Sequence, residues 1–449
     1  MMRLVGLFLL LPGAAFACAL PPSVILTLPT GHYITGAALT VALTAVMGAA
    51  SARLPAMAPR VLREGPARVP RMVLTYASFL VFLGVFLLGI LGPADPMHNL
   101  LTLVFWSGVW IGLPLASMIL GNLWWGLTPW HAPVVLLRGL IGRRGGVGLG
   151  RLSHWPAVAG LAGFSWFQIV SLSPSDPRSL VQAVLVYYLV ILALAVAEGE
   201  DWLDEGEFLT VFFAMVSRIA PFWRERMGGR VTSHAGWPGA QVLRMPAFDL
   251  SQMAFVTVAL GALSFEGLSE TFFWLGLIGE NPLEFTGRSA VMGVNTVGLV
   301  GAWALTALGL WAVLALGRRW GGRRFAAGPM MLSFLAIAAG YHVAHFFVTL
   351  LTSAQYLLAA MNDPLFRGDA VLGLPPFYIS LGFLSDPGMM TVLYAVQFIA
   401  ILGAHLLAVL LVLKLVGPQA SALAHLPMTV LMVGYTVLGL WLLSTARGV

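Results

Sequence analysis

The chain has 449 residues, of which 59% are hydrophobic and only 9% are charged. A water-soluble domain carries roughly a quarter charged residues, because its exposed surface must be largely polar. This composition excludes an ordinary soluble domain and predicts a membrane protein. The net charge of +6 comes without any nucleic-acid-binding motif, so we expect no nucleic-acid partner. The single cysteine excludes a disulfide framework within the chain.

The N-terminal residues have the three parts of a secretory signal peptide. Met1-Met2-Arg3 is a short basic segment, Leu4 to Ala14 is apolar, and Ala15-Phe16-Ala17 matches an A-x-A cleavage site. We therefore expect residues 1–17 to be a signal peptide and residues 18–449 to form a single polytopic membrane domain. An uncleaved first helix and lipid modification of Cys18 are the alternatives. A cleaved and an uncleaved segment both leave the following residues outside the cytoplasm.

Long apolar runs follow one another along the rest of the chain. Lipid offers no partner to backbone N–H and C=O groups, so these runs must form helices or a closed barrel. Runs of about 20 residues suit helices. The predicted fold class is an all-α, polytopic transmembrane helical bundle of about ten spans with interfacial amphipathic helices. The spans are expected at 32–50, 72–92, 98–120, 155–172, 178–197, 248–266, 289–315, 329–358, 389–416 and 426–445.

The arginine distribution predicts how these spans are oriented. Arginines concentrate in the connections 53–71, 138–151, 218–244 and 318–324, which alternate with connections that hold very few. Basic residues are retained on the cytoplasmic side of a membrane. We therefore expect a bacterial inner-membrane protein in contact with the lipid bilayer, with its mature N- and C-termini on the periplasmic face.

Two of the connections predicted to be cytoplasmic are too apolar to be plain loops. Residues 121–142 combine several tryptophans with an apolar run and predict an interfacial or re-entrant element. Residues 200–228 begin with acids, continue through the apolar run Phe208 to Phe213, and end with arginines. This order of charges complements a helix dipole, so it predicts an amphipathic helix on the cytoplasmic surface.

Histidines inside the predicted spans are functional candidates, because ionisable residues are costly to place in a membrane. His342 and His345 lie three residues apart in the eighth span, near one helix face. At 1.5 Å per residue, His345 and the ninth-span His405 lie about 21 Å and about 23 Å from the outer ends of their spans. The three imidazoles are expected to converge near mid-membrane and to ligate a divalent metal or haem iron. Hydrogen bonds between helices, or a proton or substrate path, are the alternatives.

Carboxylates near the outer surface are a second group of candidates. Glu266 and Glu270 lie four residues apart at the outer end of the sixth span, and Asp363 lies in an outer loop. They are candidates for binding a cation, or for acting as a general base if burial raises a pKa. Ordinary solvated charge is the alternative. Motifs of common soluble enzymes, such as G-x-S-x-G and the P-loop, are absent.

Several stretches of the chain resemble one family. They are Gly121 to Trp130 (GNLWWGLTPW), Glu207 to Pro221, Phe265 to Glu270 (FEGLSE), Gly340 to His345, Asp363-Pro364 and Pro427 to Ser444 (PMTVLMVGYTVLGLWLLS). The chain resembles the bacterial multi-pass membrane proteins named fenitrothion hydrolase, although Thr128 stands where their first motif has Asn. The resemblance implies a small-molecule substrate, an organophosphate triester, that is hydrolysed with release of a phenol. It implies no particular catalytic residues.

Three functions are therefore expected as alternatives. The first is this hydrolysis, assisted by a metal that activates water. The second is a redox or metal-handling protein that holds a metal or haem through His342, His345 and His405. The third is a transporter of a small apolar solute. Its packing and motion would depend on the small residues of the seventh span, which are Gly293, Gly298, Gly301 and Gly309.

Overall fold

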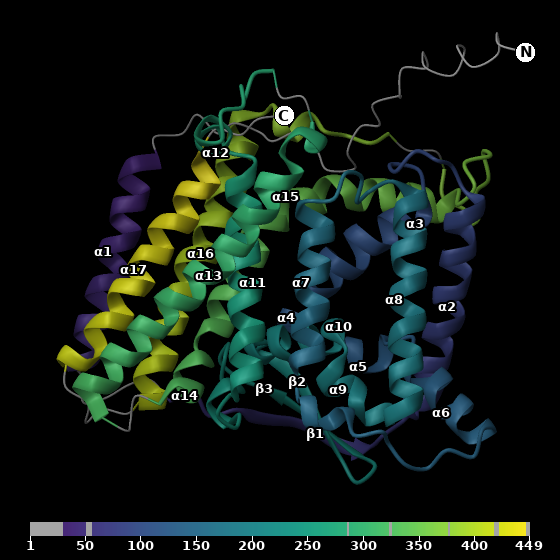
Figure 1. Cartoon of the computed structure of the whole chain (residues 1–449), viewed down its shortest axis with the longest axis horizontal. Coiled ribbons are helices and arrows are strands. Elements are labelled where there is room, and N and C mark those ends of the chain that lie inside the picture. Colours follow the sequence, from purple (N-terminus) through teal and green to yellow (C-terminus); the bar gives the residue numbers. More distant parts are fainter. Residues whose placement is uncertain are drawn as a thin grey trace, which may run out of the picture.

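The computed structural model describes residues 30–50, 56–284, 287–322, 326–375, 378–416 and 422–445. The expected signal peptide and Cys18 lie outside these ranges. Within them, long helices run side by side and alternate in direction, so that they form one bundle (Figure 1). The predicted all-α fold class is confirmed, and the chain is a multi-pass membrane protein by the length and composition of its helices.

Every expected span coincides with a helix. The long helices are α1 (Thr30–Ala50), α2 (Arg71–Leu91), α7 (Trp155–Ile169), α8 (Pro177–Glu198), α11 (Leu250–Ser269), α13 (Arg288–Gly321), α15 (Phe334–Asn362), α16 (Pro387–Val416) and α17 (Ala422–Ser444). The remaining span is continuous but composite, and consists of α3 (Leu100–Leu103), the π-helix η1 (Val104–Gly112) and α4 (Leu113–Leu120).

The number of helices that meet the requirements of a membrane span is smaller than the ten expected. In the described ranges, eight helices are long and apolar enough to cross a membrane. Helix α7 has 15 residues, or about 22 Å at 1.5 Å per residue, which is less than the hydrocarbon thickness of about 30 Å. In α1 the apolar stretch whose side chains are described is Tyr33–Val46. Hydropathy along the chain locates both helices. It overstates the length of α7, expected over 155–172, but not that of α1, expected over 32–50.

Short helices occupy the connections. They are α5 (Trp124–Leu127), α6 (His131–Leu140), η2 (Leu149–Leu152), η3 (Glu200–Trp202), α9 (Leu203–Gly206), α10 (Phe208–Val216), η4 (Ser217–Ile219), η5 (Val242–Arg244), α12 (Phe272–Leu277), α14 (Ala327–Met331) and η7 (Gly382–Leu384).

A small antiparallel sheet, which the hydropathy pattern does not indicate, completes the fold. Strands β1 (Arg60–Pro66), β2 (Phe222–Met227) and β3 (Arg230–Ala235) pair in the order β1-β3-β2. The β2–β3 hairpin turns through Gly228 and Gly229, whose φ angles of 56° and 77° favour glycine. The sheet lies where α2 begins and α8 ends, at the bottom of Figure 1. Because these strands belong to the arginine-rich connections 53–71 and 218–244, we call this the basic end of the bundle. The other end is called the opposite end.

The segment expected to be a surface amphipathic helix is instead inserted into the bundle. Eight of the nine residues of α10 are buried, so the prediction of a cytoplasmic surface helix is wrong. Glu207, just before α10, caps it by accepting hydrogen bonds from the N–H groups of Leu209 and Thr210. Because this cap and the apolar side chains on every face find partners inside the protein, burial is favoured over the interface.

The tryptophan-rich segment beside it, for which an interfacial or re-entrant element stays a prediction, packs its tryptophans against neighbouring helices. Trp124 and Trp130 are only 5% and 4% exposed. The Trp124 ring stacks on Phe213 of α10 at 4.9 Å between centroids, and the Trp130 ring N–H donates to the backbone carbonyl of Tyr188 in α8. The two tryptophans therefore anchor α5 and the start of α6 against α10 and α8, whereas Leu136 and Leu140 later in α6 are 45% and 82% exposed.

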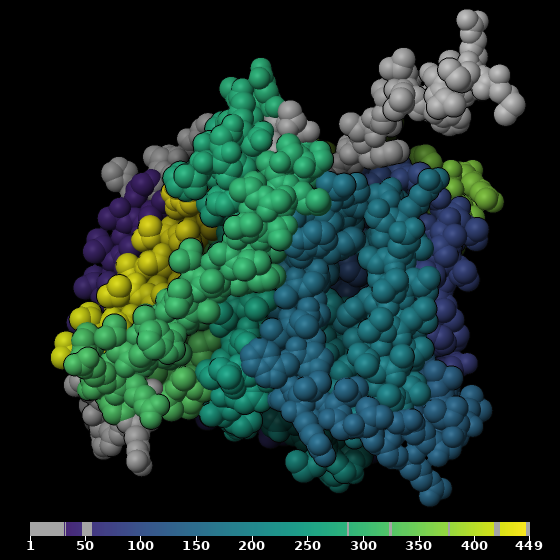
Figure 2. All heavy atoms as spheres, in the orientation of Figure 1, coloured from purple at the N-terminus to yellow at the C-terminus, as the bar shows by residue number. Residues whose placement is uncertain are grey.

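The outside of the bundle is apolar where α13 crosses it. Figure 2 shows α13 running obliquely over the near face in light green. Val297, Leu305 and Trp311 of this helix are 71%, 72% and 69% exposed. An apolar surface of this kind is suited to contact with lipid, because water would penalise it.

The glycines of α13 do not act together as a packing surface. A Cβ atom added at Gly298 would lie 2.5 Å from the Phe265 ring, whereas one added at Gly293, Gly301 or Gly309 would meet nothing within 4 Å. The close approach expected along this helix is thus present at Gly298 but not at these other positions. Close packing occurs instead between α15 and α16, where a Cβ added at Gly340 would lie 2.2 Å from that of Ala404.

Candidate functional site

The π-helix η1 shapes the centre of the site. Its C-cap residue Leu113 donates its backbone N–H to the carbonyl of Gly108, five residues back. Such segments are rare and occur frequently at functional sites. The Trp110 carbonyl, inside η1, lies 3.1 Å from His342 Nε2 of α15. The widened helix is thereby tied to α15, and its tryptophans form one wall of a groove.

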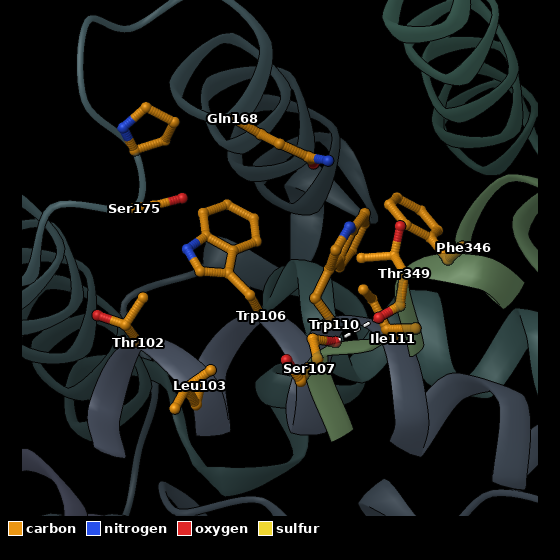
Figure 3. Close-up of a pocket in the computed structure, with 12 residues that line it drawn as sticks. Thr102, Leu103, Trp106, Ser107, Trp110, Ile111, Gln168, Ser175, Phe346 and Thr349 are labelled. Carbon is orange, nitrogen blue, oxygen red and sulfur yellow. Dashed lines mark hydrogen bonds between the residues drawn. The ribbon is translucent and has the colours of Figure 1, made fainter. Parts of the chain in front are cut away.

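This groove lies between η1, α7 and α15. The space in it that a water molecule can occupy is about 30 Å³, and it is partly open to the surroundings. Figure 3 shows Trp106 and Trp110 side by side, with Thr102 on one side and Phe346 and Thr349 on the other. The lining consists of Thr102, Leu103, Trp106, Ser107, Trp110, Ile111, Gln168, Pro174, Ser175, Phe346, Thr349 and Ser353. Most of the surface of this lining is apolar, so the groove favours contact with apolar groups over charged ones.

Some polar atoms of the residues that line the groove have no partner within the described part of the protein. Thr102 Oγ1, Trp106 Nε1 and Trp110 Nε1 are buried and have no hydrogen-bond partner in the described part of the chain. A buried donor without a partner costs about 1–3 kcal/mol. An acceptor atom of a bound molecule would relieve that cost at these positions.

A carboxylate, an amide and an imidazole meet at the edge of the groove. Glu266 Oε1 of α11 accepts a hydrogen bond of 2.7 Å from the Gln168 side chain of α7. The same oxygen lies 3.3 Å from His345 Nε2 of α15. The side chains of Glu266 and His345 are 15% and 12% exposed. Three helices thus hold one oxygen of a half-buried carboxylate, and Gln168 links it to the groove.

The other two candidate carboxylates do not join Glu266. Glu270 is exposed at the C-cap of α11, and Asp363 caps α15. The N–H groups of Arg367 and Gly368 donate to the Asp363 carboxylate. Burial acts to raise the pKa of Asp363, but these backbone hydrogen bonds outweigh it and lower that pKa. Asp363 therefore stabilises the loop that follows α15. It does not suit the role of a general base, because backbone N–H groups already occupy both of its oxygens.

The three predicted histidine ligands do not come together as one set. His342 and His405 are buried, and each uses one ring nitrogen on a backbone carbonyl, that of Trp110 and that of Ile401 respectively. His345 faces Glu266 instead. In the ranges that the structure describes, no group of three or more His, Cys, Asp or Glu side chains is placed to hold a metal ion. The donor set therefore does not fit a metal ion or a haem iron held by these three residues together.

Gln168, Trp106 and Trp110 are site residues that the sequence interpretation does not include. The two tryptophans are four residues apart within one apolar run, a signal shared with any aromatic helix face. A glutamine near the end of a span carries no signal at all. Only the packing of α7 against α11 brings Gln168 to Glu266.

The chain matches no protein-family model, no curated protein and no solved structure. The fold and the site define a multi-pass helical membrane protein with an aromatic groove and an adjoining acid–amide–imidazole cluster. This geometry is what supports a function for the protein.

Proposed function

We propose that this protein is a membrane hydrolase that cleaves small apolar organophosphate triesters. The observation that carries the proposal is the Glu266 carboxylate, held on one oxygen by Gln168 and His345 beside the aromatic groove. The chemistry agrees with what the family resemblance implies. The native substrate class is the neutral triester, because the groove offers an apolar lining and hydrogen-bond donors but no cation.

Glu266 acts as the general base. Its Oε1 atom is positioned by Gln168 and faces His345, while no hydrogen bond or ion pair in the described chain engages Oε2. That second oxygen is free to accept a proton from water. A positioned base of this kind typically contributes about 10²–10⁴-fold to a rate. His345 and Gln168 are positioning residues, because they act on the carboxylate and not on the substrate.

The tryptophan N–H groups bind the phosphoryl oxygen, or the sulfur that replaces it. The free Nε1 groups of Trp106 and Trp110 are buried in the groove wall. Fixed donors in a site with little water stabilise the negative charge that develops on this atom as the phosphorus is attacked. Phe346, next to His345 in sequence, provides an apolar contact for the aryl group.

The reaction balances without a co-reactant other than water. Glu266 takes one proton from water as the water oxygen forms its bond to phosphorus. The bond from phosphorus to the aryl oxygen breaks, and its electron pair leaves with that oxygen. The aryl oxide then takes the proton from the Glu266 carboxyl group. The products are a phosphodiester acid and a phenol, and the carboxylate is restored.

We further propose that the groove faces the periplasm of a bacterium. The arginine-rich connections gather at the basic end, which the positive-inside rule assigns to the cytoplasm. The Glu266 cluster lies one turn from the other end of α11. Apolar triesters would reach it from the adjacent lipid leaflet.

Turnover of an aryl phosphotriester that releases a coloured nitrophenol tests the proposal in the purified full chain. Glu266→Gln should lower kcat/KM by about 10²-fold or more, since it removes the base and keeps the shape. Glu270→Gln is the matched control, because it removes the same charge one turn further along α11 and should leave turnover unchanged. Absence of turnover in the wild type, or equal rates in the two variants, would reject this function.

A further inference from the structure

A cluster of arginines surrounds Trp125 at the basic end and has no place in the proposed reaction. The Arg226 guanidinium of β2 lies 3.9 Å from the centre of the Trp125 ring, and that of Arg71 lies 5.1 Å from it. Such distances are typical of cation–π contacts. Segments far apart in the sequence thus place two cations against one aromatic ring.

Arg71 keeps this tryptophan in position. Its Nε–H donates to the Trp125 backbone carbonyl at 3.2 Å, and its guanidinium lies 3.7 Å from the Asp204 carboxylate. The charge of Arg71 is therefore partly neutralised by the protein. Its role is to orient the ring, which leaves the other arginines to meet a ligand.

Arg224 and Arg226 have no such compensation. Both are exposed, and neither takes part in an ion pair in the described ranges. The Arg226 side chain is nevertheless partly shielded from water where its guanidinium lies against the Trp125 ring. This shielding, and then the like charges of Arg224 and Arg71, lower the pKa of Arg226, so the guanidinium groups repel one another. The intervening Glu225 points to the other face of the strand, where it lies 3.4 Å from His234. An anion would relieve this repulsion.

The surroundings indicate a lipid rather than a free anion. Phe222 and Met227, at the two ends of β2, are 47% and 86% exposed. Trp125 lies beside the first turn of the membrane helix α2, and tryptophan is enriched at headgroup depth. We propose that Arg224, Arg226 and Trp125 form a binding site for the phosphate of an anionic phospholipid headgroup. The guanidinium groups hold the phosphate oxygens by paired hydrogen bonds.

Native mass spectrometry of the detergent-solubilised full chain, titrated with phosphatidylglycerol or phosphatidylcholine, tests this site. The wild type should bind phosphatidylglycerol more tightly than phosphatidylcholine. The double change Arg224→Gln, Arg226→Gln should weaken phosphatidylglycerol binding about 20-fold, since each basic residue near anionic lipid contributes a factor of about five. Arg144→Gln, which removes an exposed charge in another loop of the arginine-rich connections, should change it less than twofold.

Other results of this experiment would contradict the lipid site. Equal weakening by Arg144→Gln would overturn the proposal, because binding would then follow net charge and not this cluster. Displacement of phosphatidylglycerol by millimolar inorganic phosphate would overturn the lipid as ligand. If the double variant does not fold, Arg226→Gln and Arg226→Lys carry the test. The glutamine variant should then bind phosphatidylglycerol more weakly than the lysine variant, and equal affinities would overturn the site.

Discussion

Two carboxylates inside the bundle, Glu207 and Glu266, have opposite surroundings. Glu207 is fully buried, and its oxygens accept hydrogen bonds from the N–H groups of Leu209 and Thr210, the Thr210 hydroxyl and the Tyr187 hydroxyl. Glu266 is partly exposed beside the groove and has neighbours on one oxygen only.

Under the proposed function, this difference separates a structural acid from a general base. When fixed donors engage both oxygens, the carboxylate holds a helix in place and has no lone pair left for chemistry. When one oxygen is free beside a cavity, the same group can take a proton. Burial alone does not indicate a reactive group, because the more buried carboxylate is the one with hydrogen-bond donors on both oxygens.

The largest expected effect is on stability, at Glu207. Glu207→Ala removes the cap of α10 and leaves the Tyr187 and Thr210 hydroxyls without their acceptor. Losing a cap costs about 1 kcal/mol and each buried group left unpaired about 1–3 kcal/mol, so the unfolding free energy should fall by about 3 kcal/mol or more. Unfolding in mixed detergent micelles measures it. Glu205→Ala, at an exposed position nearby, should change stability by less than about 0.5 kcal/mol. Equal losses in the two variants would contradict the structural role of Glu207.

A smaller effect, on activity, is expected at His345. His345→Gln should lower triester turnover about tenfold, because a misoriented carboxylate is a poorer base but is still present. His405→Gln is the matched control on α16, where the imidazole bonds only the Ile401 carbonyl of its own helix. The control should retain wild-type turnover. If His405→Gln slows turnover as much as His345→Gln, the position of His345 beside Glu266 is not what matters.

The smallest effect is expected at Asp249, the N-cap of α11, whose side chain and that of Gln252 form a reciprocal capping box. Asp249→Ala should cost about 1 kcal/mol. Burial acts to raise the pKa of Asp249, but hydrogen bonds from Ser251, Gln252 and Ser153 outweigh it and hold the pKa below its ordinary value of 3.8. The folded protein therefore favours the ionised form of the Asp249 carboxylate over the protonated form.

The pH dependence of this cap follows from the lowered pKa. Its contribution is fully present above the ordinary pKa and is lost as the pH falls through the lowered value. Asp249→Asn keeps a capping oxygen and removes the titration. Melting curves of the wild type and Asp249→Asn should therefore differ by a constant amount from about pH 7 to 8, where His154, 4.0 Å from the Asp249 carboxylate, is neutral, and converge only below about pH 4. A difference that changes near neutral pH would show that another group is responsible.

Much of the fold could be predicted because its signals are local. An apolar run commits its backbone to a helix, and every expected span coincides with one in the structure. The position of α10 could not be predicted in this way, because Phe208 to Phe213 followed by arginines is compatible with an interface as well as with a bundle interior. The sheet was missed as well, since its strands β1 and β2 are short and rich in charge.

The sequence by itself determined the class of the protein, the positions of its long helices and their alternation, because hydropathy and arginine placement act segment by segment. It also singled out His345 as an ionisable residue inside a span and Glu266 as a carboxylate at the outer end of another. Only the tertiary structure decided that these two meet, that Gln168, 98 residues away, joins them, and that His342 and His405 turn to backbone carbonyls instead of to a metal. Those contacts depend on which helices pack together and on how far each is shifted along its axis relative to its neighbour. No local pattern along the chain specifies either.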